Sequence, residues 1–484
     1  MAIGRVTFSK GTGKGVAPKN VQDIRLKAGN AKITLFWSDP TDTIVEEQTL
    51  CTWKGTKVVY KAGSYPTGPT DGTVVVDNQV RDAYNETGFE INGLTNGTTY
   101  YFALFPYSDT NVYNTNEANR TSGTPQAYKI YGVKRSLTSS NPAWERIEDS
   151  VGLIANAQKG STAVRNDFDS IYPWSNIITC NYNNTTKKVV AYYGDSTFKF
   201  DGSNGYVMTI IPEFYYRRYQ EDGYEYIYIS ETELDGYSKS EEFMIGRYTM
   251  SGSASGVYSR SGYAPFVSKT ISDFRSYAKN LGTGWHQLDW HYFLIQMLYL
   301  VEYADYDSQT KLGQGNVTGG SALNSGGCND LGMKSGCLVD DGAHSVIYRG
   351  IEDIFGNIYQ FLDGLNIKDY IAYICYDPTK YASDVFTGDY KAIGYTNATT
   401  SSSYIKKLGY DSNNPIIALP IEVDGSSSTY IPDRYYCNSG NRIARVGGSC
   451  GNGTSDIAGL WCWFCSYASS DASSYYGARL LKTS

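Results

Sequence analysis

The chain has 484 residues and a net charge of −7, and 14% of its residues are aromatic while 19% are charged. It contains 45 Tyr and 50 Gly. This length exceeds one ordinary hydrophobic core and predicts several domains, and the composition favours strands, turns and aromatic contact surfaces over helical bundles. The modest charge and the lack of a Lys/Arg block argue against nucleic acid as a partner.

Neither a signal peptide nor a membrane span is expected. The first residues, Met1 to Val6, lack the apolar core of a signal peptide. The most apolar run, from Tyr292 to Val301, is too short to cross a bilayer and contains Gln296. We therefore expect no membrane insertion, and a protein that either stays where it is made or leaves by a route other than secretion, such as inside a virus particle released by lysis.

Residues 1–20 are rich in Gly and Lys and predict a flexible arm. The following stretch alternates with period two, because Ile33, Leu35 and Trp37 are separated by residues that would face the other way. A second strand is expected over residues 56–61. Further on, Tyr100, Phe102 and Leu104 are expected on one face of a third strand.

The turn Gly93 to Tyr100, rich in Asn and Gly and entering a strand at Tyr100, resembles the corner of a fibronectin type III domain. The resemblance covers residues 21–125 and implies an all-β immunoglobulin-like sandwich, a module that usually acts as a spacer. The stretch from Thr121 to Pro125 is interpreted as the linker that closes it.

Residues 126–204 predict a β-rich connecting segment with short aromatic strands, for example over 189–193, and a further strand over 207–211 follows it. Four phrases resemble a segment of phage tail proteins that precedes a lectin-like tip. They are Asp169 to Trp174, Tyr192 to Asp195, Asp201 to Gly205 and Ile211 to Tyr216.

Two helices are predicted in the rest of the chain. One covers residues 272–281, where apolar side chains form one stripe and Gly282 supplies a left-handed stop. The other covers 289–303 and is apolar nearly all round, so it should be buried. Two helices among many strands indicate an α+β fold.

Glu242 to Tyr248 resembles the opening strand of the formylglycine-generating branch of the C-type lectin fold, and Arg349 to Gly364 resembles its Gly-Asn-Val-Trp-Glu-Trp signature. The resemblance implies a C-type-lectin-like ligand-binding domain over residues 205–484. Gly356 would permit a tight turn and, with Asn357, belong to the framework. The signature identifies a fold and not a function.

The C-terminus resembles the framework of variable proteins that retroelements diversify, as found in phage tail tips. The matching phrases are Arg445 to Gly448, Ala458 to Trp461 and Gly477 to Leu481. In that family, adenines of template Asn codons ending in a pyrimidine are randomised, which never yields Lys, Glu, Gln, Met or Trp. Residues 435–481 contain no Lys, Glu, Gln or Met. Trp461 and Trp463 are then fixed framework.

The variable region is expected over about residues 435–477, and its Tyr, Ser, Gly and Asn content is also what antibody paratopes favour. The predicted ligand-binding residues are Tyr435, Tyr436, Cys437, Asn438, Ser439, Asn441, Ser449, Cys450, Asn452, Ser455, Asp456, Cys462, Phe464, Cys465, Tyr467, Ser469, Asp471, Ser474 and Tyr475. The alternative is a loop-rich terminus of low complexity.

Cys462 and Cys465 have the spacing of a redox or zinc pair, and Cys437 and Cys450 could add two ligands. A metal site and a reversible disulfide stay open. The runner-up function is a formylglycine-generating-type oxidase that uses Cys462 and Cys465. The three histidines, His286, His291 and His344, are better explained as structural residues.

Two further classes stay open. A glycan-cleaving tail spike would need a pair of carboxylates, and adjacent ones such as Glu352 and Asp353 are present. Neighbouring side chains on a strand usually point apart. A purely structural baseplate protein would bind no host surface. Asp/Asn-rich loops admit calcium, but no ordered ligand ladder is visible.

The resemblances together imply a receptor-binding, host-adhesion protein of a phage tail tip, located in the virion. Its partners would be a host cell-surface receptor, either protein or glycan, and other virion tail proteins. A trimer is expected by analogy with tail fibres. We expect no enzymatic activity, no catalytic residue, no metal and no cofactor.

Overall fold

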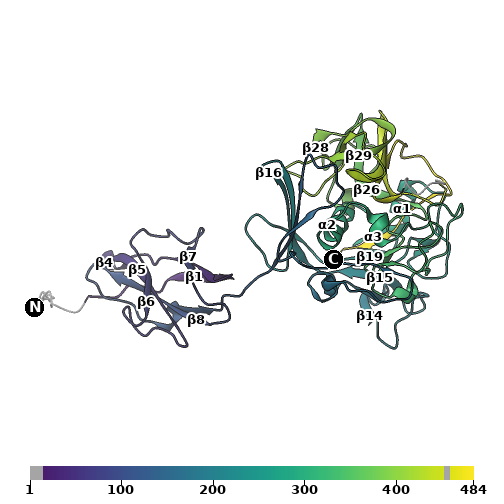
Figure 1. Cartoon of the computed structure of the whole chain (residues 1–484). Helices are drawn as coiled ribbons and strands as arrows, with labels where there is room; N and C mark the ends of the chain where they lie inside the picture. Colours follow the sequence, from purple (N-terminus) through teal and green to yellow (C-terminus); the bar gives the residue numbers. More distant parts are fainter. Residues whose placement is uncertain (1–14, 452–457, 484) are drawn as a thin grey trace, which may run out of the picture. The chain divides into compact units, whose positions relative to one another are not determined.

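The chain folds into two units, Met1–Tyr128 and Lys129–Ser484. A computed structural model describes residues 15–451 and 458–483 (Figure 1). The fold is mostly β-sheet, and the described residues contain three α-helices. In the described part of the chain no helix combines the length and apolarity needed to cross a membrane.

The N-terminal unit consists of two antiparallel sheets and a hairpin. The first sheet has the order β1 (Gln22–Gly29), β2 (Lys32–Ser38), β7 (Phe89–Asn92). The second has the order β6 (Thr73–Asn78), β5 (Trp53–Ala62), β8 (Tyr100–Ser108), β9 (Arg120–Gly123). The hairpin is β3 (Thr43–Val45) with β4 (Gln48–Cys51).

The core of this unit lies between the two sheets. Ile33, Leu35 and Trp37 of β2 are buried while the residues between them are half-buried, so the predicted alternation is confirmed. Phe102 and Leu104 of β8 complete the same cluster. Such clusters hold two sheets together because each inward side chain removes apolar surface from water.

The turn before β8 is closed by a hydrogen bond in which the Thr95 backbone N–H donates to the Tyr100 hydroxyl over 3.0 Å. Residues 15–20 of the predicted arm are in part attached to this unit, because Asn114 Nδ2 donates to the Pro18 carbonyl oxygen and to Asn20 Oδ1. The rest of the predicted arm, residues 1–14, lies outside the described residues.

The C-terminal unit begins with two sheets that the predicted connecting segment helps to build. One has the order β11 (Glu145–Glu148), β10 (Ile130–Ser136), β17 (Tyr224–Ser230), β16 (Phe214–Glu221), β18 (Ser238–Ser240). The other has the order β14 (Lys188–Tyr192), β13 (Ile178–Asn183), β15 (Tyr206–Ile211), β19 (Phe243–Gly246), β35 (Leu480–Lys482), β22 (Trp285–Gln287).

The predicted separation of residues 126–204 from the residues that follow was therefore wrong. Strand β10 pairs along its whole length with β17, and β13 pairs with β15. Both partners lie after residue 204, so the segment and the following domain share their sheets. Strand pairing distant in sequence cannot be inferred from local turns and aromatic residues.

A nine-stranded sheet carries the C-terminal part of the chain. Its path is β28 (Lys391–Thr396), β27 (Ile371–Ile374), β26 (Tyr359–Lys368), β32 (Asn441–Gly447), β33 (Gly459–Cys465), β31 (Ile431–Cys437), β29 (Thr400–Leu408), β30 (Pro420–Val423), and β34 (Tyr476–Gly477) pairs with β26. In Figure 1 its green strands β28 and β29 lie across the helices from β14 and β15.

Shorter elements connect these sheets. Small sheets are formed by β12 (Gln158–Lys159), β23 (Gly336–Cys337), β24 (Ile347–Tyr348) and β25 (Ile351–Glu352), and by β20 (Ser251–Ser253) with β21 (Gly256–Tyr258). The 3-10 turns are Glu117–Asn119, Asp167–Ser170, Trp174–Asn176, Asn329–Leu331 and Pro378–Lys380.

The two predicted helices are present as α1 (Ile271–Lys279) and α2 (His291–Tyr303). Thr270 and Asp273 form a capping box that starts α1, which satisfies backbone N–H groups that a helix start leaves unpaired. Every residue of α2 is buried, as its all-round apolar pattern predicts. The structure adds α3 (Ser308–Leu312), a five-residue helix too short for a periodic signal.

Candidate functional site

Three neighbouring strands of the nine-stranded sheet, β31, β33 and β32, carry most of the predicted variable region. Side chains alternate between the two faces of a strand, so paired residues share a face. Tyr436 of β31 and Arg445 of β32 are both registered opposite Phe464 of β33. These three side chains therefore lie on one face, which we call the outer face.

An aromatic cage encloses Arg445 on this outer face. The guanidinium carbon lies 3.5 Å from the ring centroid of Tyr476, 4.3 Å from that of Tyr467, 5.0 Å from that of Phe464 and 5.4 Å from that of Tyr359. Ring faces attract cations through their quadrupole. We call this group the Arg445 cluster.

Arg445 is fully buried, and none of its three guanidinium nitrogens has a hydrogen-bond partner among the described residues. A buried charge without polar partners is costly, and the four rings compensate part of that cost. The cage also reaches the surface, because Tyr467 is 37% exposed. The cluster is thus an aromatic surface with a positive charge directly beneath it.

Several polar residues of the predicted variable region are also accessible to solvent. Asn438, Ser439, Asn441 and Ser474 are exposed, whereas Tyr436, Phe464, Ser469, Asp471 and Tyr475 are half-buried. Tyr436 packs against Phe464 with ring centroids 4.1 Å apart and ring planes tilted by 30°, which extends the aromatic surface along β31. The predicted binding residues Asn452, Ser455 and Asp456 lie outside the described residues.

Six of the predicted binding residues are buried and cannot touch a ligand in this structure. They are Tyr435, Cys437, Ser449, Cys450, Cys462 and Cys465. Strand alternation explains three of them, because Tyr435 pairs with Trp463 and Cys437 with Cys465 on the inner side. Their assignment to the binding surface was wrong, since residue type alone does not tell which strand face a side chain takes.

The inner side of β33 rests on α2. The Trp463 ring lies 5.2 Å from that of Phe293 and 5.9 Å from that of Tyr292, and Trp461 contacts Tyr299 at 5.6 Å. Both tryptophans are buried. The strand that carries the outer face is therefore anchored by large apolar side chains on its opposite side.

A loop beneath the sheet supports its end. Gly356, with φ of 75°, donates its backbone N–H to the Gly447 carbonyl oxygen over 2.8 Å, at the last residue of β32. The buried Asn357 donates from Nδ2 to Asp353 Oδ2 over 2.9 Å and accepts from Asn316 Nδ2 over 3.0 Å. This hydrogen-bonded turn positions the start of the segment that follows β32.

Burial, together with the neighbouring Glu352 carboxylate, raises the pKa of Asp353 to about 7. The folded state then binds a proton more tightly than the unfolded chain, whose Asp pKa is about 3.9, so the free energy of unfolding falls as pH rises from about 4 to 7. We expect the free energy of unfolding of the C-terminal unit to increase by on the order of 1 kcal/mol per pH unit as the pH falls from about 7 to 5.5. Its melting temperature should therefore be higher at pH 5.5 than at pH 8.

Glu352 acts in the same direction, because burial raises its pKa as well. Asp289 does not offset the trend: burial opposes the ionised form, but His291 and His286 hold its pKa far below the usual value, so its contribution changes only below about pH 4. The Asp353→Asn variant should show a smaller slope by differential scanning calorimetry. A melting temperature that is constant or lower at pH 5.5 would contradict this account.

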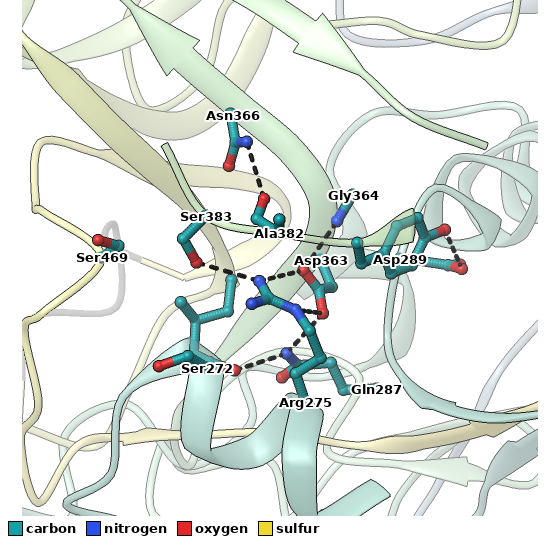
Figure 2. A network of polar contacts seen from close by, with 12 residues as sticks. Ser272, Arg275, Gln287, Asp289, Asp363, Gly364, Asn366, Ala382, Ser383 and Ser469 are labelled. Atoms are coloured by element: carbon teal, nitrogen blue, oxygen red, sulfur yellow. Dashed lines mark hydrogen bonds and ion pairs between the residues drawn. The ribbon is translucent and has the colours of Figure 1, made fainter. Parts of the chain in front are cut away.

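A buried polar network joins α1 to the sheet beside the variable region (Figure 2). Arg275 of α1 makes a two-pronged ion pair with Asp363 of β26, with Nε to Oδ2 at 2.8 Å and Nη2 to Oδ1 at 2.7 Å. Gln287 Nε2 donates to the same carboxylate over 2.9 Å. Charge-assisted paired bonds of this kind fix orientation as well as distance.

The network continues to the segment between β27 and β28. Arg275 Nη2 donates to Ser383 Oγ over 3.1 Å, and Asn366 Nδ2 donates to the Ala382 carbonyl oxygen over 2.9 Å (Figure 2). The next residue, Asp384, accepts a hydrogen bond from the Ser469 hydroxyl. A predicted binding residue is thus attached to the sheet through this segment.

The cysteine pair does not form a redox or zinc site in this structure. All nine cysteines are buried, and no disulfide joins any two of them. Residues three apart on a strand face opposite sides, so Cys462 and Cys465 of β33 point away from each other. Burial, first, and the neighbouring Cys437 raise the pKa of Cys465 well above its ordinary value, which disfavours the reactive thiolate.

The described ranges contain one group of three side chains with metal-ligand spacing, His286, Asp289 and His291, all buried. The Asp289 oxygens already accept hydrogen bonds from His291 Nδ1 over 2.6 Å and from the Tyr381 hydroxyl over 2.7 Å. The group is therefore explained as a structural network. His344 lies elsewhere and contacts Asp341.

Sequence reasoning missed Arg445 and Tyr359 as parts of the Arg445 cluster, whereas Tyr476 falls inside the predicted variable region. Arg445 stood inside a framework phrase and Tyr359 inside the signature phrase, and both were interpreted as packing. Strand register brings them together, since β26 pairs with both β32 and β34. Alternation within β32 was a usable signal for Arg445, but its partners were not visible from the sequence.

No protein-family model and no curated protein matches the chain. Among solved structures it is similar to "Structure of PvdO from Pseudomonas aeruginosa", with 14% sequence identity and a TM-score of 0.27. That match covers 59% of this chain and 97% of the other.

Proposed function

We propose that the protein is a receptor-binding, host-adhesion protein of a bacteriophage tail tip, and that its C-terminal face is diversified by a retroelement. The observation that carries the proposal is the Arg445 cluster, an aromatic surface in a region that also has accessible polar residues. Aromatic and Arg side chains dominate the binding energy of protein interfaces, and a polar rim excludes water around them.

Two features of the fold support the domain types in this proposal. The N-terminal strand orders β1-β2-β7 and β6-β5-β8-β9, together with the Thr95–Tyr100 hydrogen bond, agree with a fibronectin type III sandwich. In the C-terminal unit, β19 pairs with β35 close to the end of the chain, and two helices pack beneath the sheets. This arrangement is compatible with a C-type-lectin-like domain.

The division of labour within β33 supports exchangeable binding. The inward Trp461 and Trp463 anchor the strand on α2. The outward Phe464 packs against the rings of Tyr359, Tyr436 and Tyr467 on the outer face. Changing outward residues should therefore alter the surface with little repacking beneath it. Several copies in one tail would multiply weak contacts through avidity.

Binding to bacterial cells tests the proposal. Fluorescently labelled full-length protein should bind some strains in a panel, and Tyr467→Ala should reduce that binding about tenfold or more, because it removes an exposed aromatic contact. Tyr224→Ala is the matched control, since Tyr224 is 39% exposed against 37% for Tyr467 but lies on β17, outside the variable region.

Two outcomes would contradict the proposal. If the wild-type protein binds no strain, a structural baseplate role is favoured instead. If both tyrosine variants lose the same amount of binding, the Arg445 cluster is not the contact surface. Sequencing the reading frame in natural populations tests the retroelement part, which requires differences concentrated in the codons for residues 435–477.

A further inference from the structure

A pocket of about 350 Å³ lies outside the variable region. It is formed where β13 ends, β15 begins and β21 ends. Its lining includes Asn183, Gly202, Gly205, Tyr206, Tyr258 and Arg260. Pockets of about this size are typical of small-ligand sites, in which a few polar groups set the orientation of the ligand.

Arg260 is the cation of this pocket. Its guanidinium carbon lies 4.3 Å from the Tyr258 ring centroid and 3.7 Å from that of Tyr263. Its Nε is buried without a hydrogen-bond partner. Among the described residues no carboxylate pairs with it, whereas Arg218, Arg275 and Arg349 of the same unit each pair with one.

The turn from Asp201 to Gly205 keeps one wall of the pocket bare. Gly202 has a φ of 80°, and a Cβ there would lie 2.9 Å from the Cβ of Arg260. Gly205 has a φ of 117°, and a Cβ there would lie 2.6 Å from the Tyr182 carbonyl oxygen. Side chains at these two positions are therefore strained and sterically excluded.

An aromatic platform forms another wall. Tyr206 and Tyr258 stack with ring centroids 5.8 Å apart and an interplanar angle of 21°, and Tyr258 is 38% exposed. Tyrosine offers an apolar ring together with a hydroxyl that can hydrogen-bond. The pocket thus combines a flat apolar surface, hydroxyl and amide groups, and one cation without an acidic partner.

We propose that this pocket binds an acidic saccharide. The planar guanidinium of Arg260 matches a carboxylate through two parallel hydrogen bonds, and it presents no acceptor that would repel one. The apolar face of a sugar ring would lie against Tyr258, and its hydroxyls would bond to the polar lining. The site does not depend on the function proposed above, because none of its lining residues belongs to residues 435–477.

Titration calorimetry with the full-length protein tests this site. The probes are glucuronic acid and N-acetylneuraminic acid, with N-acetylglucosamine as a neutral sugar and inorganic phosphate as a simple anion. We expect an acidic sugar to bind, and Arg260→Gln to weaken it about tenfold or more, as loss of a charge-assisted pair does. Arg260→Lys should lose less, because the charge remains without the planar fork.

Arg217→Gln is the matched control, since this Arg also stacks on a tyrosine, Tyr219, at 4.3 Å but does not line the pocket. It should bind the acidic sugar as the wild type does. Tyr258→Ala, checked for folding by circular dichroism, should also weaken binding. The proposal is overturned if no acidic sugar binds, if N-acetylglucosamine or phosphate binds equally well, or if Arg260→Gln binds unchanged.

Discussion

Replacing Trp463 with Ala is expected to lower the free energy of unfolding of the C-terminal unit by about 3 to 5 kcal/mol. The indole is fully buried and packs on Phe293 and Tyr292 of α2. Removing it leaves a cavity between the sheet and the helix, and the dense packing there restricts collapse into the space. Chemical denaturation, followed by circular dichroism, measures the change.

The neighbouring Phe464→Ala should cost much less, about 1 kcal/mol. Phe464 is half-buried on the outer face, and its removal would let water reach Arg445, which offsets part of the lost packing. Comparison of these adjacent positions tests whether the outer face can change without loss of the fold. Equal destabilisation of the two variants would rule out that division.

Asp363→Ala is expected to destabilise the same unit by about 3 to 5 kcal/mol. The substitution leaves Arg275 almost fully buried without its carboxylate, since the two side chains are 10% and 1% exposed. It also removes an acceptor for Gln287 and for the Gly364 backbone N–H (Figure 2). Equilibrium unfolding in urea provides the measurement.

Two controls test whether the loss of stability comes from the buried ion pair and not from the loss of any charged residue. Glu145→Ala breaks the exposed pair with Lys134, in which Glu145 is 66% exposed, and should change stability by less than about 1 kcal/mol. The double variant Arg275→Met and Asp363→Leu removes both charges and should recover much of the loss. If the double variant is as unstable as Asp363→Ala, the uncompensated charge is not the cause.

Asp363→Ala should also affect the binding surface. Arg275 holds Ser383, and the adjacent Asp384 accepts the hydrogen bond from Ser469. Losing the ion pair therefore frees the segment that anchors part of the variable region. We expect weaker binding to host cells from this variant even under conditions in which it remains folded.

Local patterns were enough for individual elements. Alternation at Ile33, Leu35 and Trp37 predicted β2 and its buried face, and the all-round apolar run predicted the buried α2. These signals work because side-chain periodicity reflects which face is buried. The short α3 and the membership of residues 126–204 in the C-terminal sheets were not predicted, because neither produces a periodic pattern in the sequence.

The candidate site was predicted in part. Exposed or half-buried residues such as Tyr436, Phe464 and Tyr467 were identified by composition. The same composition wrongly included Tyr435, Cys437 and Cys465, because a residue one step along a strand faces the opposite way. Strand boundaries and register were needed to separate the two groups, and a single sequence leaves both uncertain by one or two residues.

The sequence by itself determined which residue types are available to the C-terminal face. It also determined that α2 and β33 are apolar enough to be buried. Only the tertiary structure decided that Arg445 lies inside an aromatic cage, and that Arg260 lines a pocket without an acidic partner. The reason is that both environments are assembled from strands and loops far apart in the chain. Their contacts follow from register and packing, which no local pattern records.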